Sequence, residues 1–349
     1  MTKILIVKTS ALGDVIHAFP VVQLLSQKYP GAQIDWVVEQ PLVDLVKSHP
    51  HVNQVFAIQS RDWRKSFLEK KGWQAIQQFR RQLQAEEYDL VYDLQGNMKS
   101  GLITWLARSP VKIGFGRQTV PEWPNCLVTN LHYNPPPGNN IRDDYLFLVD
   151  QQPTHPVEGV KLHISPTEQA KIAQILTHPH LQGEKKVMVC QGSVWTNKQM
   201  TQEHLAQFLQ KIHQEGGARF LLIWGTEAEK LVVMELARLF PNHAVVIDRL
   251  QLATLQNLMA QIDLVISMDS LPLHLAGTTP TPTYGLFGAS SANKYKPIGS
   301  HAYQGSCPYG KTFEKRCPIL RTCRTGSCIK EINIDHLFSD FQAWWQQQE

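Results

Sequence analysis

The stretch KTSALGD, residues 8–14, follows a short apolar run from Ile4 to Val7 that predicts a buried strand. A helical pattern begins near Asp14, so backbone N–H groups and the positive end of a helix dipole would face a ligand where the strand ends. The turn holds one glycine and lacks the GxGxxG pattern of a dinucleotide-binding turn. Asp14 is therefore either a helix-capping acid or a carboxylate that can take a proton from a sugar hydroxyl.

Two later segments carry residue types that bind a diphosphate and its sugar. In CQGSVWTNKQMTQEHL (residues 190–205), Ser193 follows a strand and Lys198 precedes a helix. Hydroxyls and amides could surround the diphosphate oxygens while lysine supplies a point charge, or Lys198 could be a solvated loop residue. In LIWGTEAEK (residues 222–230), Glu227 or Glu229 could accept hydrogen bonds from sugar hydroxyls, or could simply favour the first turn of a helix.

In a third segment, DLVISMDSLPLHLAG (residues 263–277), Asp269 and Ser270 end an apolar strand and His274 follows five residues after Asp269. A lone aspartate after a strand is usually a helix cap. An acid, a hydroxyl and an imidazole within one short run instead predict a polar ligand site.

Positive charge is concentrated between residues 61 and 82, although the net charge of the chain is only +4. RDWRKSFLEKKGW (61–73) and FRRQ (79–82) hold seven cations, interleaved with Trp63, Phe67 and Trp73. This pattern is typical either of a solvated helix face or of a basic surface that meets an anionic substrate or lipid head group. The mild net charge does not indicate a nucleic-acid partner.

Six cysteines are present, and Cys307, Cys317, Cys323 and Cys328 crowd one C-terminal segment. Nine, five and four residues separate them, which matches no standard zinc motif. We therefore predict packed, free or redox-labile thiols in this segment, with metal binding as the alternative.

Strand-like and helix-like segments alternate along the chain, and these elements must position the residues above. Strands are predicted at 4–7, 34–38, 55–58, 90–94 and 111–114, with helices at 15–28, 41–48 and 72–86 and a loop at 132–140. A second series of strands and helices begins near residue 185. This alternation predicts two doubly wound α/β domains with parallel sheets, whose ligands gather at the carboxyl ends of the strands.

The length of 349 residues and the hydrophobic fraction of 43% fit two globular domains. We predict an N-terminal domain at 1–165, a C-terminal domain at 166–330, and a terminal helix at 331–349 that could pack back on the first domain. The ligand site is expected in the cleft between the domains. The first apolar run is too short for a signal peptide, and no run reaches the about 20 apolar residues that cross a bilayer. The prediction is a cytoplasmic protein, or one peripheral on the inner face of a membrane.

Four segments resemble the ADP-heptose:lipopolysaccharide heptosyltransferases, a family of inverting glycosyltransferases with the GT-B fold of two Rossmann-like domains. They are ILIVKTSALGDVIHAFP (4–20), DWVVEQ (35–40), YDLVYDLQGNMKSGLI (88–103) and ISMDSLPLHLAG (266–277). The resemblance spans nearly the whole chain. It implies metal-independent transfer of heptose from ADP-L-glycero-D-manno-heptose to the Kdo region of lipid A, most like the members that add the first heptose of the lipopolysaccharide core.

The resemblance also implies a role for each matching residue. Asp14 corresponds to the catalytic base. The implied donor-binding residues are Ser193, Lys198, Glu229, Asp269, Ser270 and His274. The implied acceptor-binding residues are Thr9, Ser10, Arg61, Arg64 and Lys65. The implied partners are the nucleotide-sugar donor, an anionic lipid-linked saccharide acceptor and the membrane surface, with no separate cofactor, no metal and no nucleic acid.

One position departs from the family pattern, because Leu271-Pro272 follows the Asp-Ser pair where the family has a glycine. Proline lacks an N–H and leucine disfavours a positive φ, so we expect the donor pocket to differ locally. Three alternatives stay open. The chain could be an enzyme that adds the second heptose, because its cysteine cluster resembles the cysteines of those enzymes. It could also be a GT-B nucleotide-sugar epimerase, or a GT-B nucleotide-sugar-binding protein without catalysis.

Overall fold

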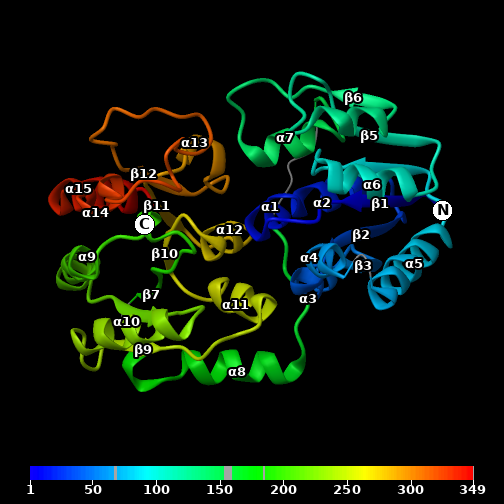
Figure 1. Cartoon of the computed structure of the whole chain (residues 1–349). Coiled ribbons are helices and arrows are strands. Elements are labelled where there is room, and N and C mark those ends of the chain that lie inside the picture. The colour runs from blue at the N-terminus through cyan, green and yellow to red at the C-terminus, as the bar shows by residue number, and fades with distance from the viewer. Residues whose placement is uncertain (67–68, 153–158, 184, 349) are drawn as a thin grey trace. The chain divides into compact units, whose positions relative to one another are not determined.

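The computed structural model describes residues 1–66, 69–152, 159–183 and 185–348, which form two compact units, residues 1–163 and 164–349. Each unit holds one six-stranded parallel sheet (Figure 1). The strand order is β3-β2-β1-β4-β5-β6 in the first unit and β12-β11-β10-β7-β8-β9 in the second. Both are the doubly wound order, which reverses between β1 and β4 in one sheet and between β7 and β10 in the other. The predicted pair of Rossmann-like α/β domains is confirmed.

Helices flank the sheet of the first unit (Figure 1). Its strands are β1 (Lys3–Val7), β2 (Gln33–Glu39), β3 (Gln54–Ile58), β4 (Leu90–Asp93), β5 (Val111–Phe115) and β6 (Leu131–Tyr133). Its helices are α1 (Leu12–His17), α2 (Phe19–Lys28), α3 (Val43–Lys47), α4 (Ser60–Lys65), α5 (Lys70–Gln84), α6 (Met98–Leu106) and α7 (Ile141–Phe147), with 3-10 helices η1 (Gln40–Leu42) and η2 (Trp123–Leu127).

The second unit repeats this architecture. Its strands are β7 (Lys186–Cys190), β8 (Arg219–Leu222), β9 (Ala244–Val246), β10 (Leu264–Met268), β11 (Thr283–Phe287) and β12 (His301–Gln304). Its helices are α8 (Pro166–Leu176), α9 (Gln202–Gly216), α10 (Glu227–Arg238), α11 (Leu252–Met259), α12 (Leu271–Ala276), α13 (Ala292–Tyr295), α14 (Ser327–Lys330) and α15 (Ile334–Trp345), with 3-10 helices η3 (Pro179–Leu181) and η4 (Thr196–Lys198).

The five strands predicted in the first half are present, but the predicted helix at 15–28 and the predicted loop at 132–140 differ from expectation. The helix predicted at 15–28 is two helices, α1 and α2, that meet at Ala18. Pro20, in the first turn of α2, has no N–H to continue the hydrogen bonds of α1. The loop predicted at 132–140 begins as the edge strand β6, whose partly exposed LHY sequence carries no apolar run.

A separate apolar core supports each sheet. In the second unit the C-terminal helix α15 contributes to this core, with the rings of Phe341 and Phe208 centred 5.6 Å apart. Within the second unit, the buried face of α15 is covered by α9 and β12. Among the residues that the structure describes, no helix is both long and apolar enough to cross a membrane.

Candidate functional site

Asp14 lies in the first turn of α1, just after the loop that leaves β1. The helix begins at Leu12, three residues before the helix predicted at 15–28, and Ala11 is the extended N-cap residue. Oδ2 of Asp14 accepts a hydrogen bond from the Ala11 N–H at 3.3 Å. The other oxygen, Oδ1, has no hydrogen-bond partner within the described ranges, and the side chain is partly exposed. The carboxylate therefore supports the helix start and keeps one oxygen available to a ligand.

Gln95, in the loop after β4, holds the turn in which Asp14 lies. Its Oε1 accepts the backbone N–H groups of Thr9 and Ser10, both at 3.2 Å. Ser10 is partly exposed, whereas Thr9 is fully buried and its hydroxyl finds no partner among the described residues. Thr9, expected as an acceptor contact, is thus buried in the turn, and Ser10 is the more accessible of the two residues. Gln95 lies in the family-like segment 88–103, but no sequence pattern marked it as a site residue.

The buried side chain of Asp93 holds the Gln95 loop by hydrogen bonds. This carboxylate is completely buried at the end of β4, and its Oδ1 accepts the N–H groups of Gln95 and Gly96 at 3.0 and 2.9 Å. Its Oδ2 accepts the Thr104 hydroxyl at 3.1 Å and the Asn125 amide at 2.7 Å. A buried carboxylate with four donors is well satisfied, so it fixes the loop rigidly.

Lys8 places a buried cation beside the same turn. The side chain is 3% exposed, and its Nζ lies 4.7 Å from the centre of the Tyr145 ring. Burial lowers the pKa of Lys8, although the negative charges of Asp14 and Asp93 oppose that shift. In its protonated form the lysine attracts the Asp14 carboxylate. The sequence shows that a lysine follows the apolar strand, but it does not show that the lysine side chain is buried.

The basic helix α4 is tied to the end of β2 by Glu39. This carboxylate accepts the Lys99 ammonium at 2.8 Å and both the hydroxyl and the N–H of Ser60, the first residue of α4. Burial would raise the pKa of Glu39, but the Lys99 and Ser60 hydrogen bonds outweigh it and hold the pKa below its usual value. The backbone N–H of Glu39 also donates to the carbonyl of Thr9 at 3.1 Å. The start of α4 is thereby linked to the Asp14 turn.

The predicted basic surface is exposed on α4 and α5, where Trp63 packs on Phe79 with ring centres 5.4 Å apart. Phe67, expected in this surface, lies outside the described residues. We call this surface the basic helix pair; its exposed cations are Arg61, Arg64, Lys65, Lys70, Lys71, Arg80 and Arg81. None of these cations forms an ion pair with a described carboxylate, so their charge is available to an anionic partner.

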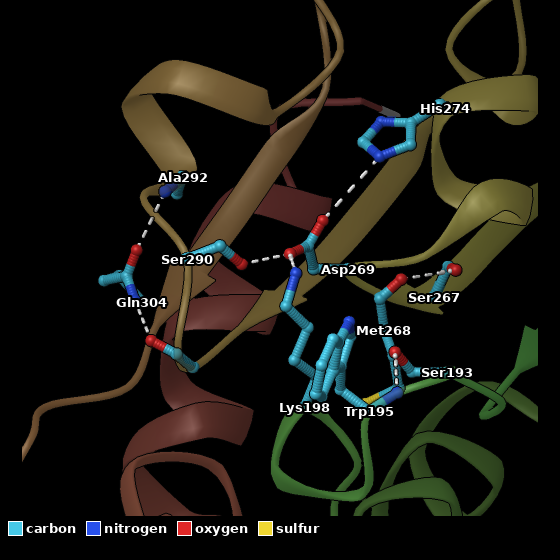
Figure 2. A network of polar contacts seen from close by, with 11 residues as sticks. Ser193, Trp195, Lys198, Ser267, Met268, Asp269, His274, Ser290, Ala292 and Gln304 are labelled. Atoms are coloured by element: carbon cyan, nitrogen blue, oxygen red, sulfur yellow. Dashed lines mark hydrogen bonds and ion pairs between the residues drawn. The ribbon is translucent and has the colours of Figure 1, made fainter. Parts of the chain in front are cut away.

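In the second unit, Lys198 and Asp269 form a buried ion pair at the point where the strand order reverses. Lys198 ends η4 after β7, and Asp269 follows β10, which pairs with β7. The ammonium lies 2.6 Å from Oδ2 of Asp269, which also accepts the Ser290 hydroxyl, while Nε2 of His274 lies 3.7 Å from Oδ1 (Figure 2). The structure therefore joins three predicted donor-site residues in one network and adds Ser290, which sequence reasoning missed.

The electrostatic balance of this network favours the ionised carboxylate. Burial would raise the pKa of Asp269, but the charges of Lys198 and His274 and the hydrogen bonds from Lys198 and Ser290 hold it below the usual value. Asp269 thus positions the Lys198 ammonium near the loops that follow β7 and β11. A cation fixed this way can meet a phosphate without first paying the entropy of ordering a free side chain.

The Leu271-Pro272 pair starts α12 rather than distorting the chain. Ser270 is the N-cap residue, and its buried hydroxyl has no hydrogen-bond partner among the described residues. Pro272 stands in the first turn, where a helix needs no N–H donor, and Leu271 has no positive φ. The expected local difference is therefore the loss of one backbone donor at this helix start, without a conformational conflict.

Glu229 lies beside the loop that carries Ser193. Its Oε2 accepts the N–H groups of Gly225 and Thr226 at 2.7 and 3.2 Å, which closes the start of α10. A Cβ at Gly192 would stand 2.4 Å from Oε1 of Glu229, so a larger residue there would displace the Glu229 carboxylate. The Ser193 carbonyl accepts the Gln199 amide at 2.6 Å. Glu229 therefore lies beside the loop of Ser193 at the position of Gly192.

The cysteines of the C-terminal segment form no disulfide in the part of the chain that the structure describes. Burial, and then the three other thiols of the cluster, raise the pKa of Cys328 to about 11. A hydrogen bond from the Gly326 N–H instead lowers the pKa of Cys323. The four thiols therefore lie close enough to influence one another.

Comparison with known proteins gives one consistent result. Residues 76–322, more than half of the chain, match the family described as glycosyltransferase family 9 (heptosyltransferase). A protein of Pseudomonas aeruginosa named lipopolysaccharide heptosyltransferase 1 is 29% identical over 98% of this chain and 97% of its own length.

Two examples of solved structures that share the fold come from Escherichia coli. One is Escherichia coli heptosyltransferase WaaC with ADP-2-deoxy-2-fluoro heptose, with a TM-score of 0.72 and 25% identity over 87% of this chain and 94% of the other. The second is Escherichia coli ADP-heptose lps heptosyltransferase II, with a TM-score of 0.71 and 18% identity over 99% of both chains.

Proposed function

The chain belongs to glycosyltransferase family 9, the heptosyltransferases, and from this premise we propose that it transfers heptose from ADP-heptose to the Kdo region of lipid A in lipopolysaccharide inner-core synthesis. Support comes from the lipopolysaccharide heptosyltransferase 1 that aligns with almost the whole chain and from the ADP-heptose analogue held by WaaC. The observation that carries the proposal is Asp14, a carboxylate with one uncommitted oxygen in the turn after β1.

The donor is proposed to bind the second unit, with its diphosphate near Lys198. Asp269 orients Lys198, and the Ser290 hydroxyl donates a hydrogen bond to the same Asp269 carboxylate. This network supports a preorganised positive site for the leaving ADP. Stabilising charge that develops on a leaving group is usually the largest contribution to catalysis. The Ser270 hydroxyl, which is buried without a partner among the described residues, is proposed to donate to the donor, and Glu229 to accept its sugar hydroxyls.

The acceptor is proposed to bind the first unit. Asp14 would take the proton of the acceptor hydroxyl as that oxygen attacks the anomeric carbon from the side opposite to ADP, which inverts the configuration. A protonated Lys8 would stabilise the Asp14 carboxylate before the transfer. The basic helix pair, with its uncompensated cations, would hold the acidic sugars and phosphates of the acceptor and the anionic membrane surface.

Release of ADP from ADP-heptose, measured with and without Kdo-lipid A, tests this function. We expect ADP release to depend on the acceptor and the product to gain the mass of one heptose. Acceptor-independent release of ADP would indicate hydrolysis or another use of the donor. No release with Kdo-lipid A would contradict the proposal.

Asp14→Asn tests the proposed base. General-base assistance typically contributes about 10²–10⁴-fold, so kcat should fall by that factor while the Kd for ADP and the unfolding midpoint stay unchanged. Asp44→Asn is the matched control, because Asp44 is also an acid in the first turn of a short helix of the first unit, and it is exposed. Near-normal turnover in Asp14→Asn would exclude Asp14 as the base.

A further inference from the structure

The four cysteines of the C-terminal segment, Cys307, Cys317, Cys323 and Cys328, line one small cavity in the second unit. Its volume is about 10 Å³. A single water needs roughly 10–15 Å³ on the same measure, so the space fits one atom-sized occupant and excludes an organic ligand. Four thiols around such a space are an unusual concentration of metal-ligating atoms, and none is used in a disulfide.

Two tight turns present thiols to the cavity. The N–H of Gly310 donates to the Cys307 carbonyl at 3.1 Å, and the N–H of Gly326 donates to Sγ of Cys323 at 3.4 Å. Both glycines have a left-handed backbone, with φ of 62° and 65°. A backbone N–H aimed at sulfur favours the thiolate, which is the form of cysteine that binds metal ions.

The charge around the cluster is complementary to a metal–thiolate centre. Four thiolates and one divalent cation carry two negative charges in excess, which nearby cations stabilise. Between residues 307 and 331 there are two acids, Glu314 and Glu331, against six cations, which are Lys311, Lys315, Arg316, Arg321, Arg324 and Lys330.

We propose that Cys307, Cys317, Cys323 and Cys328 bind one thiophilic divalent ion, zinc or iron, in a tetrahedral thiolate site. On binding, each thiol loses its proton to solvent and forms one metal–sulfur bond, and no oxidation is involved. No group of three or more His, Cys, Asp or Glu side chains in the described ranges is already arranged to hold a metal ion. Closing the site therefore requires the cysteine side chains that line the cavity to change rotamer.

The proposed ion would hold the loops that carry the Lys198–Asp269 network. Asn197, next to Lys198, lines the same cavity and donates to the Leu320 carbonyl at 2.6 Å. The N–H of Cys317 donates to the carbonyl of Ala289, the neighbour of Ser290, at 2.9 Å. The cysteine-rich segment therefore contacts both loops, and metal bound there would position them without touching the substrate.

The metal content of the full-length chain tests the proposal. The protein is purified under reducing conditions from medium supplied with zinc and iron and is analysed by mass spectrometry for metals. We expect one equivalent of zinc or iron per chain. After removal of the ion with a chelator, titration with Co²⁺ should produce a thiolate-to-cobalt charge-transfer band that saturates at one equivalent.

Cys323→Ser and Cys328→Ser should lose the bound ion, whereas Cys126→Ser should keep it, because Cys126 lies in the first unit and its thiol contacts the Phe115 carbonyl. If a variant does not fold, alkylation of the unaltered chain decides: zinc or Co²⁺ should protect the four clustered thiols and leave Cys126 reactive. The proposal is overturned if the chain holds no metal and gives no cobalt band, if Cys323→Ser retains the ion, or if the four residues form disulfides under these conditions.

Discussion

Replacing Asp269 by asparagine removes the charge that neutralises Lys198 and leaves its ammonium in an almost dry site. The charged atoms are 2.6 Å apart, and the two side chains are only 11% and 5% exposed. At an effective dielectric constant of about 20, unit charges at that separation attract by roughly 6 kcal/mol. Part of this attraction offsets the cost of burying the charges, and that cost remains for Lys198 in the variant. We therefore expect Asp269→Asn to lower the free energy of unfolding of the second unit by about 3–5 kcal/mol.

Urea unfolding of the ligand-free protein, followed by circular dichroism, measures this loss. Asp335→Asn is the matched control, because the Lys211–Asp335 pair is similarly close at 3.0 Å but its acid is 80% exposed. Its loss should stay below about 1 kcal/mol. Adding Lys198→Met to Asp269→Asn removes the uncompensated ammonium and should recover about 1–3 kcal/mol. The reasoning is refuted if Asp269→Asn loses no more than the control, because the buried pair would then contribute no more than a surface pair.

Three further predictions follow from the same geometry. The pKa of Asp269 is depressed in the folded protein, so its contribution to stability is complete above the ordinary aspartate pKa of about 4 and is lost as pH falls through the lower folded pKa. The melting temperature measured against pH should therefore fall in this acidic range in the wild type, and Asp269→Asn should lack this part of the decrease. Gln95→Leu removes the acceptor that holds the Asp14 turn, so kcat should fall by about 10–100-fold in steady-state assays, and a change in KM alone would contradict this. Asn125→Ala leaves Asp93 short of one buried donor and should cost about 1–3 kcal/mol in chemical unfolding, whereas a loss within experimental error would show that water replaces the amide.

The sequence alone determined the fold class and most of the candidate residues. Strands buried in a parallel sheet are short apolar runs, and each run here ends in polar residues that local pattern can identify. Asp14 after β1, Lys198 after β7 and Asp269 after β10 were all found in this way. Because the carboxyl ends of parallel strands share one edge, the pattern also predicted that polar residues of the same sheet would converge.

Only the tertiary structure decided which of these residues meet. Lys198 and Asp269 are 71 positions apart, and Gln95 is 86 positions from Thr9, yet each pair is in contact. These contacts depend on the strand order, which places β7 beside β10 and β1 beside β4, and that order is set by burial of whole sheet faces rather than by any local pattern. For the same reason the cysteine spacing did not match a known motif, although the fold brings all four thiols to one cavity.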